Sequence, residues 1–398
     1  MTDEKQRVLP LSGIKVLEMG QLIAGPFATK LLGEFGADVI KVEPPNTGDP
    51  LRKWRIVQDG TSLWWHVQSR NKRSITLDLK SEAGQSVARQ LAAEADIVVE
   101  NFSPGTMEKW GLGYEELSRN NSGLIMVRVS GYGQTGPYRD KPGFGVIGEA
   151  MGGLRYLTGN PEERSVRVGV SIGDSLSALY AIIGSLLALQ ERSRSGLGQV
   201  IDVALYESVF AMMESLVPEF DATGHVRQPS GSALPGITPS NAYKCLDGNY
   251  VLIAGNGDAI FKRLMNLIGR VDMAENPALE HNDGRSKHSK EIDEAIGAWT
   301  GARVRKDVLG KLDAERVPAG YPYTAEDILK DPHYLARGMI ETIALPGGST
   351  LKVPGVLPRL SATPGKVGGG GPSLGEHTAE VLSELAIDDA VRSQILGS

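Results

Sequence analysis

Asp174 is the residue whose type and position in the sequence most favour catalytic chemistry. It lies between an extended, glycine-bearing stretch, Val168–Gly173, and a long apolar segment that is predicted to be a helix. A carboxyl group with an unperturbed pKa of ~3.9 is ionised at neutral pH and can act as a nucleophile. An aspartate in front of a helix is also one of the commonest N-terminal caps, because its side chain accepts a hydrogen bond from a backbone N–H. The residues alone leave both roles open.

Several other kinds of site are disfavoured by what the sequence lacks. The first predicted turn has Gly20 and Gly25 without the G-x-G-x-x-G spacing, and no G-x-x-x-x-G-K-[ST] string occurs. Neither a dinucleotide site at this turn nor a P-loop is therefore supported. None of the six histidines has the H-E-x-x-H spacing, and the single cysteine cannot form a C-x-x-C pair. We expect no metal site.

The first half of the chain alternates short apolar strands with amphipathic helices. We predict strands at 14–18, 38–43, 96–101 and 124–130, and helices at 27–35 and 81–95. Such alternation is typical of a parallel sheet with helices on both faces, where ligands bind beyond the carboxyl ends of the strands. We therefore expect the functional residues directly after the strands.

The second half has a different organisation. Two apolar segments, 175–192 and 201–216, are both interpreted as buried helices, and the Gly, Pro, Ser and Thr residues of 221–241 indicate a linker. A strand at 250–254 and helices up to about Arg316 indicate a smaller domain. The chain then ends in a glycine-rich loop and a helix at 379–385.

Composition limits the environment and the partners. The 398 residues, 41% of them hydrophobic, are enough for two or three domains, and a net charge of −6 without long basic runs disfavours nucleic acid as a partner. Cys245 is the single cysteine, which is typical of a reducing compartment. No apolar signal segment and no run of about 18 apolar residues is apparent. We expect a cytoplasmic protein that binds no membrane.

Several short strings together resemble those of the class III CoA-transferases, the CaiB/BaiF family, and above all its members that use succinyl-CoA and a dicarboxylate. They occur in the order and spacing of that family over nearly the whole chain: Asn71–Lys80, Glu100–Gly105, Gly111–Tyr114, Ser130–Pro137, Gly173–Asp174, Asn276–Pro277, Asn282 with Arg285, Pro318–Gly320 and Leu374–Thr378. Each string is weak alone, and the set is specific.

The resemblance implies an α/β fold with a doubly wound, Rossmann-like large domain and a smaller α+β domain. On this plan residues 1–220 form the first part of the large domain, 221–241 a linker, 242–325 the small domain, and 326–398 a return linker and the rest of the large domain. Two chains would thread through each other as an interlocked homodimer. The active site would then lie between the large domain of one chain and the small domain of the other.

The resemblance also implies a covalent mechanism. Asp174 would attack the thioester of an acyl-CoA, giving a mixed anhydride and then an aspartyl-CoA thioester, from which an acceptor acid takes the CoA. Water must be kept from these intermediates, because they hydrolyse. The loop Gly255, Asn256 and Gly257 would fold over the reacting carbonyl, although a simple turn between strand and helix remains the alternative.

Binding residues follow from the same resemblance. Gln21, Leu22, Ile23 and Ala24 match the segment that lines the acyl and pantetheine site, and six positions match residues that hold CoA in relatives: Leu77, Lys80, Asn101, Phe102, Lys109 and Trp110. CoA would enter as part of the substrate, and no tightly bound cofactor is expected. Arg52, Arg70 and Arg73 are candidates for the far carboxylate of a dicarboxylate. Phe144 and Glu149 are candidates near the acyl group, with Glu149 orienting Asp174 or serving a structural role.

Two alternatives to a CoA-transferase remain at this point. An α-methylacyl-CoA racemase shares the fold but needs a histidine as proton donor and acceptor, and the corresponding position here is Phe144. A non-catalytic acyl-CoA-binding protein would not need Asp174. The favoured donor is succinyl-CoA, and the acceptor is a short acid such as glutarate, malate, mesaconate, itaconate or a sulfinate analogue.

Overall fold

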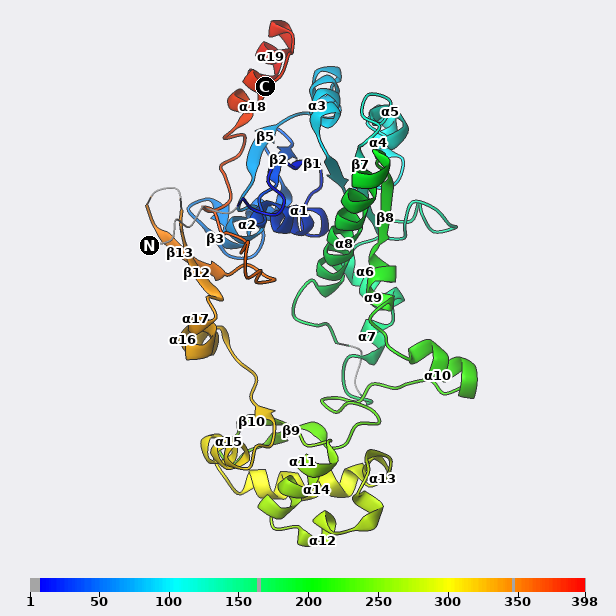
Figure 1. The fold of residues 1–398 in the computed structure, drawn as a ribbon, viewed down its shortest axis with the longest axis vertical. Helices are drawn as coiled ribbons and strands as arrows, with labels where there is room; N and C mark the ends of the chain where they lie inside the picture. Colours follow the sequence, from blue (N-terminus) through cyan, green and yellow to red (C-terminus); the bar gives the residue numbers. More distant parts are fainter. Residues whose placement is uncertain (1–7, 163–165, 346–347, 398) are drawn as a thin grey trace. The chain divides into compact units, whose positions relative to one another are not determined.

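The computed structural model describes residues 8–162, 166–345 and 348–397, drawn as a ribbon in Figure 1. The chain divides into two compact units. The first contains the described residues up to Leu154, Val168–Ser215 and the residues from His333 on, and the second contains those of Arg155–Arg167 and Leu216–Pro332. The first unit is thus built from both ends of the chain.

The first unit is organised around a parallel sheet of six strands. Their order is β5-β2-β1-β6-β7-β8, and neighbouring strands are all parallel. The strands span β1 (Lys15–Glu18), β2 (Asp38–Glu43), β5 (Arg73–Thr76), β6 (Ile97–Glu100), β7 (Ile125–Ser130) and β8 (Val200–Ala204). The chain winds outward in one direction from β1 and then in the other from β6, so the topological switch lies between these two strands.

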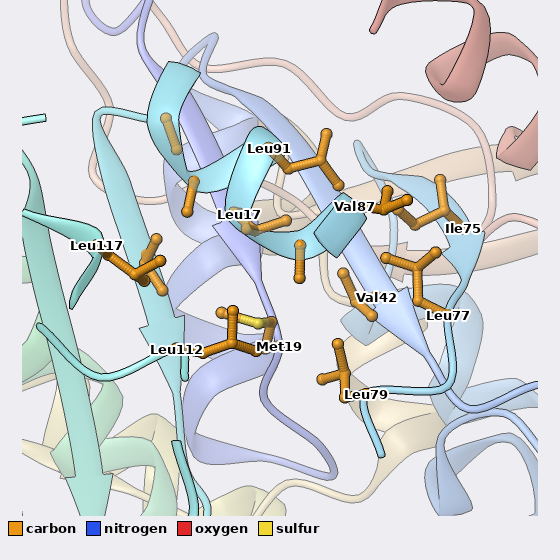
Figure 2. Close-up of a cluster of buried hydrophobic side chains, with 14 of the residues drawn as sticks. Leu17, Met19, Val42, Ile75, Leu77, Leu79, Val87, Leu91, Leu112 and Leu117 are labelled. Atoms are coloured by element: carbon orange, nitrogen blue, oxygen red, sulfur yellow. The ribbon is translucent and has the colours of Figure 1, made fainter. Parts of the chain in front are cut away.

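Helices cover both faces of this sheet because successive strand residues point to opposite sides. On one face Leu17, Val42 and Ile75 pack with Val87 and Leu91 of α3 (Glu82–Glu94), as Figure 2 shows. The C-terminal helices α18 (Thr378–Glu384) and α19 (Asp389–Leu396) contribute to the same cluster. On the other face Val16, Val39 and Ile97 pack with α1 (Ala24–Glu34) and α8 (Ile172–Ser195). The parallel sheet between two helical layers confirms the predicted α/β class.

Shorter elements complete the first unit. They are η1 (Pro50–Lys53), β3 (Val57–Gln58), β4 (Thr61–Ser62), α2 (Leu63–Gln68), α4 (Thr106–Lys109), α5 (Tyr114–Leu117), α6 (Gly145–Met151), α9 (Leu205–Phe210), β12 (Ile340–Ala344) and β13 (Thr350–Pro354). The short helix α7 (Leu154–Leu157) lies where the chain passes to the second unit.

The second unit has a small antiparallel sheet with helices. Strand β10 (Tyr250–Ala254) pairs with both β9 (Ser240–Lys244) and β11 (Ala319–Gly320). The helices are α10 (Leu216–Thr223), α11 (Asp258–Leu267), α12 (Val271–Ala274), α13 (Asn282–Lys287), α14 (Ser289–Gly301), α15 (Arg305–Ala314) and α16 (Ala325–Lys330), with the turn η2 (Pro277–Leu279) and, at the boundary, α17 (Pro332–Ala336). Its own core contains Val251, Phe261, Ile292 and Leu312.

One prediction about the second half of the chain is wrong. The segment 201–216 was expected to be a helix, but it begins inside β8 and continues as the short α9. The predicted linker at 221–241 overlaps α10 and β9 at its two ends, and residues 224–239 between them form neither helix nor strand. Val200–Ala204 is a strand because it completes the sheet beside β7, a tertiary contact that apolar composition does not reveal.

Helix α8 is also the one described helix that is long and apolar enough to cross a membrane, although 33% of its most apolar window is buried in the fold. The core helix of a globular protein passes the same test. Its inner face carries small residues, Ser177, Ala178, Ala181, Ser185 and Ala188, which pack closely on the sheet and on α1.

Candidate active site

The loops that follow β1 and β6 meet at the switch point of the sheet. The side chain of Asn101 bridges them, because its Oδ1 accepts from the Gln21 N–H at 2.8 Å and its Nδ2 donates to the Gln21 carbonyl at 2.8 Å. A side chain on Gly20 would come within 3.1 Å of Asn101 Oδ1, so glycine makes this approach possible. Ligands of open parallel sheets bind at such a point.

A cavity of about 250 Å³ opens beside these loops. Five of the residues predicted to hold acyl-CoA line it: Gln21, Leu77, Lys80, Phe102 and Trp110. Its apolar side is the edge of the core cluster in Figure 2, because Met19, Val42, Leu77 and Leu79 belong to both. An apolar pocket with a few polar groups is the usual form of a small-molecule site.

One buried arginine fixes the wall of this cavity. Arg128 on β7 donates to Glu100 at 2.7 Å and to Glu108 at 2.6 Å, and Glu100 in turn accepts from the Phe102 N–H at 2.8 Å. Burial raises the pKa of Glu100, although the bond from Arg128 opposes this. Phe102 then meets Trp110 edge-to-face, with ring centroids 5.1 Å apart. Arg128 on β7 therefore fixes the position of Phe102, and through it that of Trp110, by way of Glu100.

The other predicted acyl-CoA residues are not part of this lining: Leu22, Ile23, Ala24, Asn101 and Lys109. Lys80 and Lys109 are exposed, so their ammonium groups are accessible to an anion. Ile23 and Ala24 are buried in the fold, at 6% and 2% exposure. Leu22 has a positive φ of 65°, which is uncommon for any residue but glycine.

Asp174 is the third residue of α8, so the alternative role as its N-terminal cap is excluded. The capping position belongs to Ser171, whose side chain makes no cap hydrogen bond. Asp174 instead lies against α6, because a Cβ built on Gly145 would overlap its carboxylate. In the first turn of a helix, a carboxylate is stabilised by the positive end of the helix dipole.

The glycines around α6 explain how the aspartate is accommodated. Gly143, Gly145 and Gly148 have the G-x-G-x-x-G spacing, which sequence reasoning missed. Each of these glycines lies against other parts of the protein. A Cβ at Gly143 would come within 2.9 Å of the Gly131 Cα, and one at Gly148 within 2.8 Å of Leu205. A Cβ at Gly145 would collide with Asp174. The string follows no strand, so it serves close packing around Asp174 rather than a dinucleotide.

Sequence reasoning also missed a second motif, which contains Ser171, three residues before Asp174. Gly169–Gly173 matches the G-x-S-x-G spacing of hydrolase nucleophiles, but residues 166–170 form no strand. The strand-to-helix turn that exposes such a serine is therefore missing.

Phe144 and Glu149 belong to the same helix, α6. Phe144 is the residue before its first turn and is 67% exposed, whereas Glu149 is fully buried. A Cβ on Gly173 would lie 3.3 Å from the Glu149 Cγ, so this side chain packs beside the turn that carries Asp174.

The glycine loop lies between β10 and α11 in the second unit. The Gly255 N–H donates to the Pro239 carbonyl at 2.9 Å, and a Cβ at Gly255 would lie 2.7 Å from Leu264. Arg285, fully buried, donates to the Asn256 carbonyl at 2.6 Å and to Asp258 at 2.7 Å. Close packing against Leu264 therefore leaves no room for a side chain at position 255. Hydrogen bonds from Gly255 and Arg285 hold the two ends of the loop.

Asp258 connects this loop to a titratable group. Its carboxylate meets His281 Nδ1 at 3.0 Å. The hydrogen bond and the charge of Asp258 raise the pKa of His281, while His281 and Arg285 lower the pKa of Asp258.

The three arginines considered for substrate binding are all engaged within the fold. Arg52 pairs with Glu43 at 2.7 Å, and Arg70, fully buried, pairs with Glu34 at 2.5 Å. Arg73 pairs with Asp38, Glu380 and Glu384, and Asp38 begins β2, at the end of the sheet opposite the switch-point loops. We therefore no longer assign them to the substrate, because their guanidinium groups have partners in the fold. Among the described residues, no group of three or more His, Cys, Asp or Glu side chains could hold a metal ion.

Comparison with known proteins identifies relatives over almost the full chain. The sequence profile of CoA-transferase family III matches residues 11–378. The chain is 50% identical over 377 residues to the succinyl-CoA–D-citramalate CoA-transferase of Chloroflexus aurantiacus, covering 94% of both chains. It is 44% identical over 387 residues to the β subunit of the succinyl-CoA–L-malate CoA-transferase of that organism, covering 96% of each. A CaiB/BaiF family crystal structure from Brucella suis superposes with a TM-score of 0.83 at 35% identity, over 95% of this chain and 100% of that one.

Proposed function

Because the chain belongs to CoA-transferase family III, we propose that it moves CoA from succinyl-CoA to a small dicarboxylic acid. The observation that carries this proposal is the 50% identity, over 94% of the chain, to a transferase named for succinyl-CoA and D-citramalate. The relative at 44% identity is named for L-malate. Both acids are 2-hydroxydicarboxylates, so this class is the first acceptor to test, before glutarate, mesaconate and itaconate.

Asp174 is the nucleophile in the proposed reaction. Its carboxylate oxygen attacks the thioester carbon, the C–S bond breaks, and a succinyl–aspartyl anhydride and CoA thiolate form. The thiolate attacks the aspartyl carbonyl, which releases succinate and leaves an aspartyl-CoA thioester. The acceptor carboxylate repeats the sequence in reverse, so the product acyl-CoA leaves and Asp174 is regenerated. The close fit of its carboxylate over Gly145 supports this role.

The remaining residues act around this carboxylate. We assign CoA to the cavity lined by Gln21, Leu77, Lys80, Phe102 and Trp110, with Lys109 and Lys80 available to its phosphates. Leu22 and Ile23 belong to the acyl-side loop, Ala24 begins α1 directly after it, and Asn101 holds the loop through Gln21. For Gly255, Asn256 and Gly257 we propose the role of the catalytic glycine loop. No tightly bound cofactor is needed for this chemistry.

An exposed apolar stripe supports a homodimer. Leu179, Ile183, Leu186 and Leu187 of α8 are 44%, 51%, 45% and 65% exposed in the single chain. Their spacing aligns them along one side of the helix, and apolar surface of this extent commonly marks an interface. We infer that a second copy of the chain covers it, interlocked with the first, in the cytoplasm.

The substrate proposal is tested by incubating the protein with succinyl-CoA and each acid and separating the acyl-CoA products by chromatography. We expect D-citramalyl-CoA or L-malyl-CoA to form together with an equal amount of succinate, and at least ~100-fold less with Asp174→Asn. Release of free CoA at the same rate without any acceptor would indicate a thioesterase instead. Epimerised acyl-CoA without CoA transfer would indicate a racemase.

The dimer is tested by light scattering and subunit exchange. Mixed tagged and untagged dimers should exchange subunits only after unfolding if the chains are interlocked, whereas Leu187→Glu should weaken assembly. A monomer at micromolar concentration, or exchange within minutes under native conditions, would contradict the interlocked homodimer.

A further inference from the structure

The backbone of the loop after β1 is held residue by residue. The Met19 N–H donates to the Val99 carbonyl at 2.9 Å, and the Gly20 carbonyl accepts from Lys41 Nζ at 2.9 Å. Asn101 satisfies both backbone groups of Gln21, and the Leu22 N–H donates to both carboxylate oxygens of Asp49 at 3.1 Å. Such complete engagement is unusual for a surface-connecting loop.

Leu22 needs this restraint. Its φ of 65° lies in the left-handed region, where the Cβ of an L-residue crowds its own backbone. A leucine stays in this conformation only when its surroundings determine it, at a cost on the order of 1–3 kcal/mol. The two bonds from its N–H to Asp49 are the contacts that fix this residue directly.

Asp49 is itself fixed by a buried group of charges, which we call the strand-end cluster: Glu18, Lys41, Glu43, Asp49, Arg52 and Lys72. Lys41 contacts Glu18 at 2.7 Å and Asp49 at 2.9 Å, and Lys72 contacts Glu18 at 2.8 Å. Glu43 accepts from the Asp49 N–H at 2.9 Å and pairs with Arg52. Three acids face three bases, and none is more than 8% exposed.

Glu18 remains ionised at neutral pH, although burial lowers the pKa of Lys72 beside it to about 8. Burial alone would raise the pKa of Glu18, but the ammonium groups of Lys41 and Lys72 lower it to about 2. Buried ion pairs of this kind add little stability compared with apolar residues of the same size. Their particular effect here is geometric, because Lys41 binds both Asp49 and the Gly20 carbonyl and so connects the end of β2 to both sides of Gln21.

We propose that Asp49, supported by Lys41, is a positioning residue that holds Leu22 in its left-handed conformation and so sets the acyl-side loop before substrate binds. The inference rests on the proposed function, because it is the transfer reaction that needs this loop. Gln21 lines the CoA cavity, so a displaced loop would change the position of the acyl group relative to Asp174. Misplacement of reacting groups by about 1 Å costs on the order of 100-fold in rate.

The test compares Asp49→Asn with Glu34→Gln. Asp49→Asn keeps an acceptor for the Leu22 N–H but removes the charge that Lys41 binds. Glu34 is an equally buried acid of the first unit that pairs with Arg70 and Lys30, away from the loop. We expect Asp49→Asn to lower kcat with succinyl-CoA by ~10–100-fold and to change the Kd of free CoA by less than ~3-fold. Glu34→Gln should lower thermal stability and leave kcat unchanged.

A second readout does not depend on turnover. Hydrogen exchange at the Leu22 amide of the wild-type protein should be as slow as at the sheet amides, and at least ~10-fold faster in Asp49→Asn. Rapid exchange at Leu22 in the wild type, or an equal loss of kcat in Glu34→Gln, would overturn the inference. A wild-type protein with slow exchange but no CoA transfer would instead refute the proposed function.

Discussion

Two loops are proposed to face the acyl group, and the fold holds them by different means. The loop after β1 is held along its length by buried charged and polar side chains from β2, the start of η1 and the end of β6. The glycine loop before α11 is anchored by one backbone bond at Gly255 and by Arg285 at Asn256 and Asp258. The loop that we propose to orient the thioester is therefore preorganised, whereas the glycine loop is held only at its ends.

The two loops also differ in backbone strain. Leu22 adopts a strained φ and needs six buried charges nearby to hold it. Gly257 has an ordinary φ of −71°, so the glycine loop stores no such strain. We infer that disruption of the first loop affects stability and reactivity together, and that disruption of the second affects mainly the catalytic step.

The largest expected effect comes from removing the central base of the strand-end cluster. Lys41→Met leaves Glu18 and Asp49 without their shared partner, and breaking a buried ion pair in this way costs about 3–5 kcal/mol. Thermal or urea unfolding measures the loss. The control, Lys15→Met, breaks a half-exposed pair with Glu94 and should cost less than about 1 kcal/mol. Equal losses in the two variants would show that the cluster is not the rigid element described here.

Gly145→Ala tests whether Asp174 belongs to the preorganised part of the site. The added methyl group overlaps the carboxylate and must displace it, so we expect kcat to fall by ~100-fold or more with modest loss of stability. Gly169→Ala is the matched control, because no atom lies within 4 Å of the new Cβ. Unchanged turnover in Gly145→Ala would mean that the position of the carboxylate is not critical.

Arg285→Lys tests the anchor of the glycine loop. Lysine keeps the charge but cannot reproduce the bonds to the Asn256 carbonyl and Asp258 together. We expect a ~10-fold fall in kcat, an unchanged Kd for free CoA, and faster proteolysis between 254 and 258. Arg263→Lys, whose side chain bonds carbonyls at 315 and 316 at the surface, should leave kcat unchanged. A rise in the Kd of CoA would place Arg285 in the binding site instead.

The smallest effect is a pH dependence confined to the glycine loop. The pKa of His281 is raised above 6.5 by Asp258, so its ion pair is complete below pH 6.5 and is lost as pH rises through the raised value. Proteolysis of this loop should therefore increase slightly toward alkaline pH, and His281→Gln should abolish that change. Glu18 of the strand-end cluster does not titrate in this range, because its pKa is about 2.

The sequence was sufficient for elements whose pattern is local. Strands 38–43 and 250–254 were predicted at their observed bounds, and the helix at 81–95 differs from α3 by its capping residues alone. β8 was missed because its apolar residues run directly into α9 without a turn signal. α19 was missed although Asp388, whose side chain accepts from the Ala390 N–H, is a helix-start signal.

The site was only partly predictable for a related reason. Five predicted CoA-site residues do line one cavity, because they follow the ends of neighbouring strands. Arg52 and Arg70 looked like anion binders because the fold, rather than any local sequence pattern, brings their partners Glu43 and Glu34 to them. The strand-end cluster could not be predicted for the same reason. The role of the glycines around Asp174 depends on which residues pack against them in the fold.

Covalent catalysis through Asp174 is tested most directly by intact-protein mass spectrometry after brief incubation with succinyl-CoA and an acid quench. The account predicts an acyl or CoA adduct on the wild-type chain, mapped to the peptide that contains Asp174, and no adduct on Asp174→Ala. Turnover by the wild type without any adduct, or an adduct that persists in Asp174→Ala, would contradict it.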